Sequence, residues 1–461
     1  MDRDRIDTIA AISTAVGGGI AIIRISGNKA AAIAKALFKP GGGSGRCAFK
    51  SHRVYYGHIV KDGRILDECM LTFMKAPRSY TREDVAEISS HGGLKSAELI
   101  LSAVLEKGAV LAEPGEFTKR AFLNGRIDLT KAQAVIDIIN SKTELSHNQA
   151  INRLSGRLSA DLEEIRGRLL DLLAEIEASI DYPEYDMEEQ LPAQMEALES
   201  VKASIARLIK DGNMGLIMSE GLQTVILGRP NAGKSSLLNR MLGTDRAIVT
   251  EIPGTTRDVL SETVNIRGLP LNIVDTAGLR NSADIVESLG VKKSLEYAKD
   301  ADLILYMLDA SVDLEAEDIE NISSLESKEI ILIMNKVDLE RKFKLSDFPS
   351  DFWDRVKNFV EISTLENIGL DRLCDMIYNL FFDNRISLEN TVTVSNARDM
   401  DSLKKALAHT DAAIAAMEAG LASDLAAIDI RDAYVCLGQI LGESLADDVI
   451  DRIFSKFCLG K

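Results

Sequence analysis

Residues 228–235 read Gly-Arg-Pro-Asn-Ala-Gly-Lys-Ser and fit the phosphate-binding pattern G-x-x-x-x-G-K-[ST] without a mismatch. Gly228 and Gly233 allow a tight turn whose backbone N–H groups wrap phosphates. Lys234 can reach the β- and γ-phosphates, and the Ser235 hydroxyl can ligate Mg²⁺. The loop therefore predicts nucleotide binding.

The neighbouring segments provide the context that such a loop requires. Residues 222–227 predict a buried strand before it, and residues 235–242 predict a helix after it. A second apolar run, 271–274, leads into Asp275-Thr-Ala-Gly278. An Asp at a strand end beside the phosphate loop holds the Mg²⁺ shell, and Gly278 lets the backbone approach the γ-phosphate.

A third apolar run, 330–334, ends at Asn335-Lys-Val-Asp338. Guanine presents N1–H and N2–H₂ as donors on one edge, and the Asp338 carboxylate can accept from both. Adenine has an acceptor at N1, so the site discriminates by a factor on the order of 10⁴. Ser363 follows the strand-like run 359–362 and can support the base. The pattern predicts a guanine-nucleotide domain over residues 216–382.

Composition limits the remaining choices. The chain has 461 residues, which suggests about three domains. Its net charge of −17 means that any nucleic acid must meet a local basic patch or a partner protein. The five cysteines form no zinc spacing, no apolar run reaches about 18 residues, and the first residues lack an apolar signal core. We therefore expect a cytoplasmic protein with no membrane contact.

The sequence pattern divides the chain into successive parts. Residues 1–120 mix β-rich and helical runs, which indicates an α+β domain. Residues 121–215 and 383–461 are helical, and they flank the compact α/β part at 216–382. We predict a multidomain α/β plus α protein whose helical domain is interrupted by an inserted Ras-like P-loop domain, with a mostly parallel sheet and helices on both faces. The alternative is two separate helical domains.

Hydrolysis needs a group that orients the attacking water. Many small GTPases have a Gln after their D-x-x-G motif, but here that position is Leu279. The polar segment that follows offers three candidates, Arg280, Asp284 and Glu287, and position alone does not choose between them.

The charge on the transferred phosphoryl group must also be neutralised. Arg257 can act in cis, or a monovalent cation can serve. Asn231 can help to hold K⁺ against the phosphates, with further oxygens from residues 249–255. Thr256 is the natural second Mg²⁺ ligand, since the contact of its hydroxyl with Mg²⁺ can depend on whether the γ-phosphate is present.

Taken together, these motifs resemble the MnmE (TrmE) family of tRNA-modification GTPases. The nucleotide motifs are shared with other bacterial GTPases, whereas their combination with the N- and C-terminal motifs is specific to the family. The resemblance rests on Gly228-Arg-Pro-Asn-Ala-Gly-Lys-Ser-Ser236, Gly254-Thr-Thr-Arg-Asp258, Asp275-Thr-Ala-Gly-Leu-Arg280, Asn335-Lys-Val-Asp338, Arg24-Ile-Ser-Gly27, Ser79-Tyr-Thr-Arg-Glu-Asp84, His91-Gly-Gly93, Pro114-Gly-Glu-Phe-Thr118, Arg120-Ala-Phe-Leu-Asn-Gly-Arg-Ile-Asp-Leu129 and Cys458-Leu-Gly-Lys461.

For the nucleotide domain, the resemblance implies K⁺-stimulated GTP hydrolysis with two G domains meeting across a homodimer. It assigns the water-orienting role to Glu287 and the Mg²⁺ ligands to Ser235 and Thr256. The K⁺ ligands are Asn231, Thr250, the Ile252 carbonyl and Thr255. The predicted GTP contacts are Asn231, Ala232, Gly233, Lys234, Ser235, Ser236, Thr250, Thr255, Thr256, Asp275, Thr276, Ala277, Gly278, Asn335, Lys336, Asp338 and Ser363.

For residues 1–120, the resemblance implies a dimerisation domain that binds a tetrahydrofolate, either 5-formyl- or 5,10-methylene-tetrahydrofolate. The matching positions are Arg24, Glu87, Arg126 and Lys461, with Arg126 at a position where Lys is also found. Basic groups suit the glutamate tail of a folate, and an acid suits pterin N–H donors. Cys458 is a candidate nucleophile beside Lys461, and the alternative is a tail residue that packs near the folate.

The resemblance also implies a partner and a substrate. An FAD-dependent protein of the MnmG (GidA) family would form a heterotetramer with the dimer, and together they would modify C5 of uridine 34 in certain tRNAs.

Two other classes of protein share some of these motifs. A ribosome-assembly GTPase should carry a basic RNA-binding module, and residues 401–461 are not markedly basic. A folate-binding regulator would use GTP only as a conformational switch.

Overall fold

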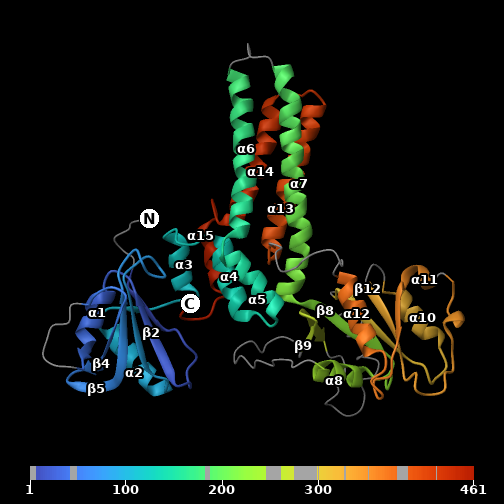
Figure 1. Cartoon of the computed structure of the whole chain (residues 1–461), viewed down its shortest axis with the longest axis horizontal. Coiled ribbons are helices and arrows are strands. Elements are labelled where there is room, and N and C mark those ends of the chain that lie inside the picture. Colours follow the sequence, from blue (N-terminus) through green and yellow to red (C-terminus); the bar gives the residue numbers. More distant parts are fainter. Residues whose placement is uncertain are drawn as a thin grey trace. The chain divides into compact units, whose positions relative to one another are not determined.

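The computed structural model describes residues 7–41, 49–181, 187–244, 261–274, 298–299, 301–325, 329–350, 352–381, 393–421 and 423–461 (Figure 1). The chain forms two compact units. Unit 1 comprises residues 1–136 and 438–461, and unit 2 comprises residues 137–437. Among the described residues, no helix combines the length and the apolar character that a membrane span needs.

Unit 1 is built on a seven-stranded sheet with the strand order β3-β4-β5-β6-β2-β1-β7. Neighbouring strands are antiparallel except for β1 and β7, which run parallel. The strands are β1 (Ile9–Ile12), β2 (Ile20–Ser26), β3 (Phe38–Pro40), β4 (Arg53–Lys61), β5 (Arg64–Met74), β6 (Val85–His91) and β7 (Val110–Leu111).

Helices α1 (Ala30–Leu37) and α2 (Leu94–Glu106) cover one face of this sheet, and their apolar residues share one core with it. Ile23 and Ile25 of β2 belong to that core. Because side chains alternate along a strand, Arg24 between them projects to the opposite face. The alternation of side chains along β2 thus places the charged Arg24 on the face of the sheet that α1 and α2 do not cover.

The C-terminal residues complete unit 1. Helix α15 (Asp447–Phe454) and the residues after it pack against α3 (Glu116–Leu123) and the start of α4 (Leu129–Asn140). Gly115 has a φ of +70°, and a Cβ there would lie 2.5 Å from the Phe454 carbonyl oxygen. Glycine is therefore required where the C-terminal turn crosses the start of α3.

Unit 2 contains a long helical bundle, which we call the helical part. It comprises α5 (Glu144–Leu154), α6 (Arg157–Asp181), α7 (Met187–Glu220), α13 (Ala397–Glu418) and α14 (Ser423–Leu441). Figure 1 shows α6, α7, α13 and α14 side by side. Ion pairs join α6 to α14 (Glu177 to Arg431, 2.6 Å) and α7 to α13 (Lys202 to Asp411, 2.9 Å). Helices from before and after the α/β part therefore form one bundle, as predicted.

The inserted α/β part contains a six-stranded sheet with the order β13-β12-β11-β8-β10-β9. Every neighbouring pair is parallel except β9 and β10. The strands are β8 (Leu222–Gly228), β9 (Ser261–Ile266), β10 (Leu269–Val274), β11 (Leu303–Asp309), β12 (Glu329–Asn335) and β13 (Asn358–Glu361). The mostly parallel sheet is thus confirmed.

Alternate residues of these strands enter two separate cores. One core contains α8 (Lys234–Thr244) and α12 (Leu370–Phe381), and the other contains α10 (Ala316–Ser323) and α11 (Phe352–Arg355). Buried strands with helices on both faces read as continuous apolar runs, which explains the runs in the sequence.

The two connections of the inserted part lie together. The chain enters it from the end of α7 and returns at residues 393–395. Gly215 of α7 is so close to Thr393 that a Cβ there would overlap the Thr393 side chain. The buried Arg153 guanidinium donates to the Thr393 carbonyl (3.4 Å) and pairs with Asp137 (2.7 Å), which fixes the returning chain.

Candidate functional site

A cavity of about 420 Å³ lies in unit 2 at the carboxyl ends of β8, β12 and β13. This is the edge of a parallel sheet where ligands usually bind, and the volume suits a nucleotide-sized molecule. Three loops supply its lining residues, which are Asn231, Gly233, Lys234, Ser235, Ser236, Asn335, Lys336, Asp338, Leu339, Ser363, Thr364 and Leu365.

The phosphate-binding loop after β8 has the backbone that the motif requires. Gly228, Asn231 and Gly233 all have positive φ, at +133°, +62° and +105°. Gly233 faces the Asn335 amide, and a Cβ there would overlap it. Successive turns of this kind point backbone N–H groups into one concavity, which suits an anion.

Lys234 begins α8 and reaches back over the loop. Its Nζ donates to the carbonyl oxygens of Gly228 (2.6 Å) and Arg229 (2.7 Å). The ammonium therefore lies over the concavity that the N–H groups form. The donor set, with one ammonium, backbone N–H groups and the Ser235 hydroxyl, fits a Mg²⁺-bound polyphosphate.

Asn335 joins the phosphate-binding loop to the base-reading loops. Its side chain is fully buried, and its Nδ2 donates to the Ala232 carbonyl (2.8 Å). Its Oδ1 accepts from the backbone N–H of Thr364 (3.1 Å). Arg240 of α8 supports the same loop through the carbonyls of Thr364 (3.2 Å) and Leu365 (3.0 Å). Asn335 therefore acts as a brace between two walls of the cavity.

Asp309 at the end of β11 supports the part of the cavity lining that contains Lys336. The sequence motifs did not identify this residue. The Lys336 ammonium lies 2.5 Å from its carboxylate, and Ser311 donates to the same group. Burial opposes ionisation, but the hydrogen bonds from Lys336 and Ser311 outweigh it and hold the pKa of Asp309 below its usual range. The signal in the sequence was an Asp closing the apolar run 303–308.

The described residues thus place ten of the predicted nucleotide residues together. Nine line the cavity, and Ala232 is the buried acceptor for Asn335. The exposed Asp338 and the buried Ser363 both belong to this lining. The remaining predicted residues lie outside the described part of the chain, and they are Thr250, Ile252, Thr255, Thr256, Asp275, Thr276, Ala277, Gly278 and Glu287.

A second polar cluster lies on the open face of the sheet in unit 1. Arg24 and Glu87 are directly opposite each other on β2 and β6, with Arg24 Nε 2.7 Å from Glu87 Oε1. Arg24 Nη1 also donates to the Gly460 carbonyl (3.2 Å), so the C-terminal turn reaches this cluster. Lys461 and Cys458 belong to that turn, in which the Lys461 N–H donates to the Cys458 carbonyl (3.3 Å).

Tyr80 lies at the centre of this cluster. The guanidinium carbons of Arg126 and Arg24 lie 4.8 Å and 5.8 Å from its ring centroid. Its hydroxyl shares a hydrogen bond with Thr118 (3.0 Å). Two guanidinium groups, a carboxylate and a ring fit a ligand that has anionic groups, N–H donors and a flat ring. Tyr80 was visible in the sequence only as part of Ser79-Tyr-Thr-Arg-Glu-Asp84.

Comparison with known proteins covers almost the whole chain. The model of the MnmE helical domain matches residues 129–458, and the model of the GTP-binding protein TrmE N-terminus matches residues 8–126. The chain is 46% identical over 466 residues to the tRNA modification GTPase MnmE of Lysinibacillus sphaericus, with 99% of each chain covered. It is 45% identical over 466 residues to the protein of that name from Bacillus subtilis, covering 99% of this chain and 100% of that one.

Among solved structures, Aquifex aeolicus Era bound to GDP·AlF4⁻ is similar over 41% of this chain and 66% of that chain, at 25% identity and a TM-score of 0.26. The relatives and the family models, which agree over nearly the full length, show that this chain belongs to the MnmE (TrmE) family of tRNA modification GTPases.

Proposed function

We propose that this protein is a K⁺-dependent GTPase that modifies C5 of wobble uridine 34 in certain tRNAs, together with an FAD-dependent partner of the MnmG (GidA) family. The observation that carries the proposal is the single cavity that unites Lys234 with Asp338, because it joins a phosphate-binding loop to a guanine-selective carboxylate. Family membership supports the link to tRNA. We infer a cytoplasmic location, where such a substrate is found.

The phosphates and the base of GTP each have a proposed partner. The loop N–H groups and Lys234 bind the phosphates, and Asp338 accepts from guanine N1–H and N2–H₂. Ser235 and Thr256 would hold Mg²⁺, while Asn231, Thr250, the Ile252 carbonyl and Thr255 would hold K⁺. Bound there, the two cations would neutralise charge on the transferred phosphoryl group. Glu287 would orient the attacking water.

The cluster around Tyr80 is the proposed folate site. Arg24, Arg126 and Lys461 would bind the carboxylates of the folate tail, and Glu87 would accept from pterin N–H groups. A bound tetrahydrofolate, in the 5-formyl or 5,10-methylene form, supplies a one-carbon unit. The side chain of Cys458 is exposed in the C-terminal turn, and we propose that it packs near a bound folate rather than acting as a nucleophile.

We propose that unit 1 pairs with a second copy of the chain through the open face of its sheet. That face exposes apolar side chains, among them Ile20 (57% exposed) and Tyr56 (56% exposed) together with Val54 and Met70. Large exposed apolar groups gathered on one face are typical of an interaction site. The heterotetramer with the MnmG-type partner would be assembled on this homodimer.

GTP turnover tests the cation mechanism. In KCl the purified protein is expected to hydrolyse GTP at least tenfold faster than in NaCl of equal ionic strength, because K⁺ neutralises the phosphoryl charge. Asn231→Ala is expected to lose the stimulation. Glu287→Ala is expected to bind GTP normally but hydrolyse it roughly 10² or more times slower. Equal turnover of the wild-type protein in both salts would refute K⁺ dependence.

Titration with 5-formyltetrahydrofolate tests the folate site. Arg126→Ala is expected to weaken binding by roughly tenfold or more, because a charge-assisted contact to a tail carboxylate is lost. Isothermal calorimetry measures the Kd. The matched control is Lys95→Ala, which removes an exposed cation from α2, the helix that covers the other face of the sheet. Equal affinities for Arg126→Ala and the wild type would place the folate elsewhere.

A further inference from the structure

A chain of three hydrogen bonds connects the helical part of unit 2 to the β9–β10 hairpin. Lys142, in the α4–α5 connection, donates from Nζ to Thr263 Oγ1 of β9 (2.8 Å). Thr263 Oγ1 donates to Asn272 Oδ1 of β10 (3.0 Å), and the Asn272 amide donates to the Glu220 carbonyl at the end of α7 (2.6 Å). We call Lys142, Thr263 and Asn272, with the Glu220 carbonyl, the latch.

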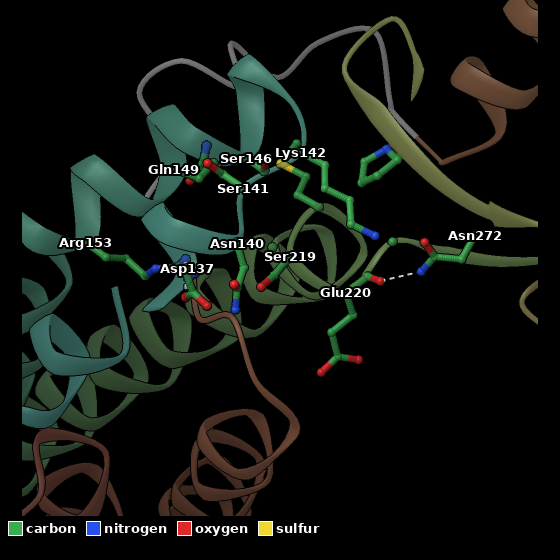
Figure 2. Close-up of a pocket in the computed structure, with 14 residues that line it drawn as sticks. Asp137, Asn140, Ser141, Lys142, Ser146, Gln149, Arg153, Ser219, Glu220 and Asn272 are labelled. Atoms are coloured by element: carbon green, nitrogen blue, oxygen red, sulfur yellow. Dashed lines mark hydrogen bonds and ion pairs between the residues drawn. The ribbon is translucent and has the colours of Figure 1, made fainter. Parts of the chain in front are cut away.

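Figure 2 shows the Lys142 side chain extended toward the strand pair, with the bond between Asn272 and Glu220 beside it. Thr263 and Asn272 are directly opposite each other in the β9–β10 pairing. Gly221 has a φ of +81°, and a Cβ there would lie 2.6 Å from the Asn272 amide nitrogen. The backbone at Gly221 therefore lies so close to Asn272 that only glycine fits at this position.

An apolar contact lies beside the latch. Leu145 of α5 packs against the core of the inserted part, and its Cβ is 3.3 Å from the Cβ position of Gly268 in the hairpin turn. The turn and both strands of the hairpin are thus touched by the helical part. The small cavity between them, of about 50 Å³, has room for a few waters and none for a nucleotide or a folate.

On the sheet side, the hairpin pairs with β8 and buries Leu269, Leu271 and Ile273 in the core of the inserted part. Among the described strands, β9 lies at the edge of the sheet and pairs with β10. Within the described residues, β10 pairs with β8 at Leu271–Val274. The latch holds the outer side of this hairpin, so the position of the hairpin depends on contacts with the helical part as well as on the sheet.

The ends of the hairpin lead straight into the proposed catalytic segments. Residues 250–256, which include three of the four proposed K⁺ ligands and Thr256, precede β9 along the chain. Asp275 directly follows β10. Any displacement of the hairpin therefore displaces the anchoring points of both segments relative to the nucleotide cavity.

We propose that the latch makes Lys142 and Thr263 positioning residues for GTP hydrolysis, through which the helical part sets the place of the β9–β10 hairpin. The inference rests on the proposed GTPase function. Neither residue lines the nucleotide cavity, so the latch acts on the rate of hydrolysis and leaves the binding of guanine nucleotide unchanged.

The test uses Lys142→Met, which keeps the apolar stem but loses the donor, and Thr263→Val, which loses the hydroxyl at nearly constant shape. Each is expected to lower kcat for GTP in KCl about three- to tenfold, as for the loss of one hydrogen bond. The Kd for fluorescent GDP and the Tm are expected to stay within twofold and about 2 °C of wild type. The double variant is expected to fall no further than the worse single variant, since both lose the same bond.

Lys142→Arg and Thr263→Ser retain the donor and the hydroxyl, and both are expected to restore kcat to near the wild-type value. Lys202→Met is the matched control, because it removes another partly exposed lysine that pairs α7 with α13, and its kcat is expected to stay at the wild-type value. If the wild type hydrolyses GTP and Lys142→Met keeps its kcat, the latch proposal is overturned. Equal losses in kcat and GDP affinity would also overturn it. If the wild type fails to hydrolyse GTP, the proposed function fails instead.

Discussion

Replacing Asp338 by Asn is expected to lower the affinity for GTP by a factor on the order of 10⁴ and to create affinity for xanthosine triphosphate. Guanine places two donors toward the carboxylate, and an amide can accept only one of them. Its NH₂ group would face the second donor unpaired. Xanthine has N1–H beside a carbonyl oxygen at C2, a donor–acceptor pair that an amide matches.

Fluorescent GDP and xanthosine diphosphate measure this exchange by direct titration. Glu340→Gln is the matched control, because Glu340 is an exposed acid two residues further on that does not line the cavity. It is expected to retain the wild-type affinity for both nucleotides. An Asp338→Asn protein that still prefers GDP would show that another group reads the base.

Gly233→Ala is expected to abolish measurable nucleotide binding, with a loss of at least about 100-fold. The residue has a φ of +105°, which L side chains rarely adopt, and its Cβ would overlap the Asn335 amide. Displacing that amide would also free the Ala232 carbonyl and the Thr364 N–H from their buried partner. Each unsatisfied buried group costs about 1–3 kcal/mol.

The chain offers a matched glycine for comparison. Gly243 lies in the last turn of α8, and a Cβ there would meet nothing within 4 Å. Gly243→Ala is expected to bind nucleotide normally and to be up to about 1 kcal/mol more stable, since Ala favours a helix. The two variants are compared by fluorescent GDP titration and thermal unfolding. Nearly normal GDP binding by Gly233→Ala would mean that the loop tolerates a different backbone.

Local pattern was enough to predict much of the fold. The apolar run 222–227 corresponds to β8, and the run 330–334 corresponds to β12. Helix α7 extends to Glu220, past residue 215 where the predicted helical stretch ends, because Ile217 and Met218 pack on the core of the inserted part. That contact depends on tertiary structure, which helical periodicity alone does not contain.

Contacts between residues far apart in the chain could not be predicted from the sequence. The sequence marks Arg24 and Glu87 separately, but only the register of β2 and β6 makes them partners. Asn335 was assigned to nucleotide binding, yet its role as a brace to Ala232 and Thr364 depends on two loops meeting. The contact between Lys142 and Thr263 spans 121 positions and follows from packing rather than from any motif.

The proximity of Gly215 and Thr393 has a consequence for how this architecture arose. A bundle whose chain leaves and re-enters at neighbouring points needs no rerouting of its helices when a foreign segment is spliced in. Insertion of a segment at this one point of the bundle is therefore compatible with the packing of its helices. The same geometry makes residues 221–392 a natural cassette for protein engineering, since a short Gly–Ser bridge from the end of α7 would rejoin the bundle.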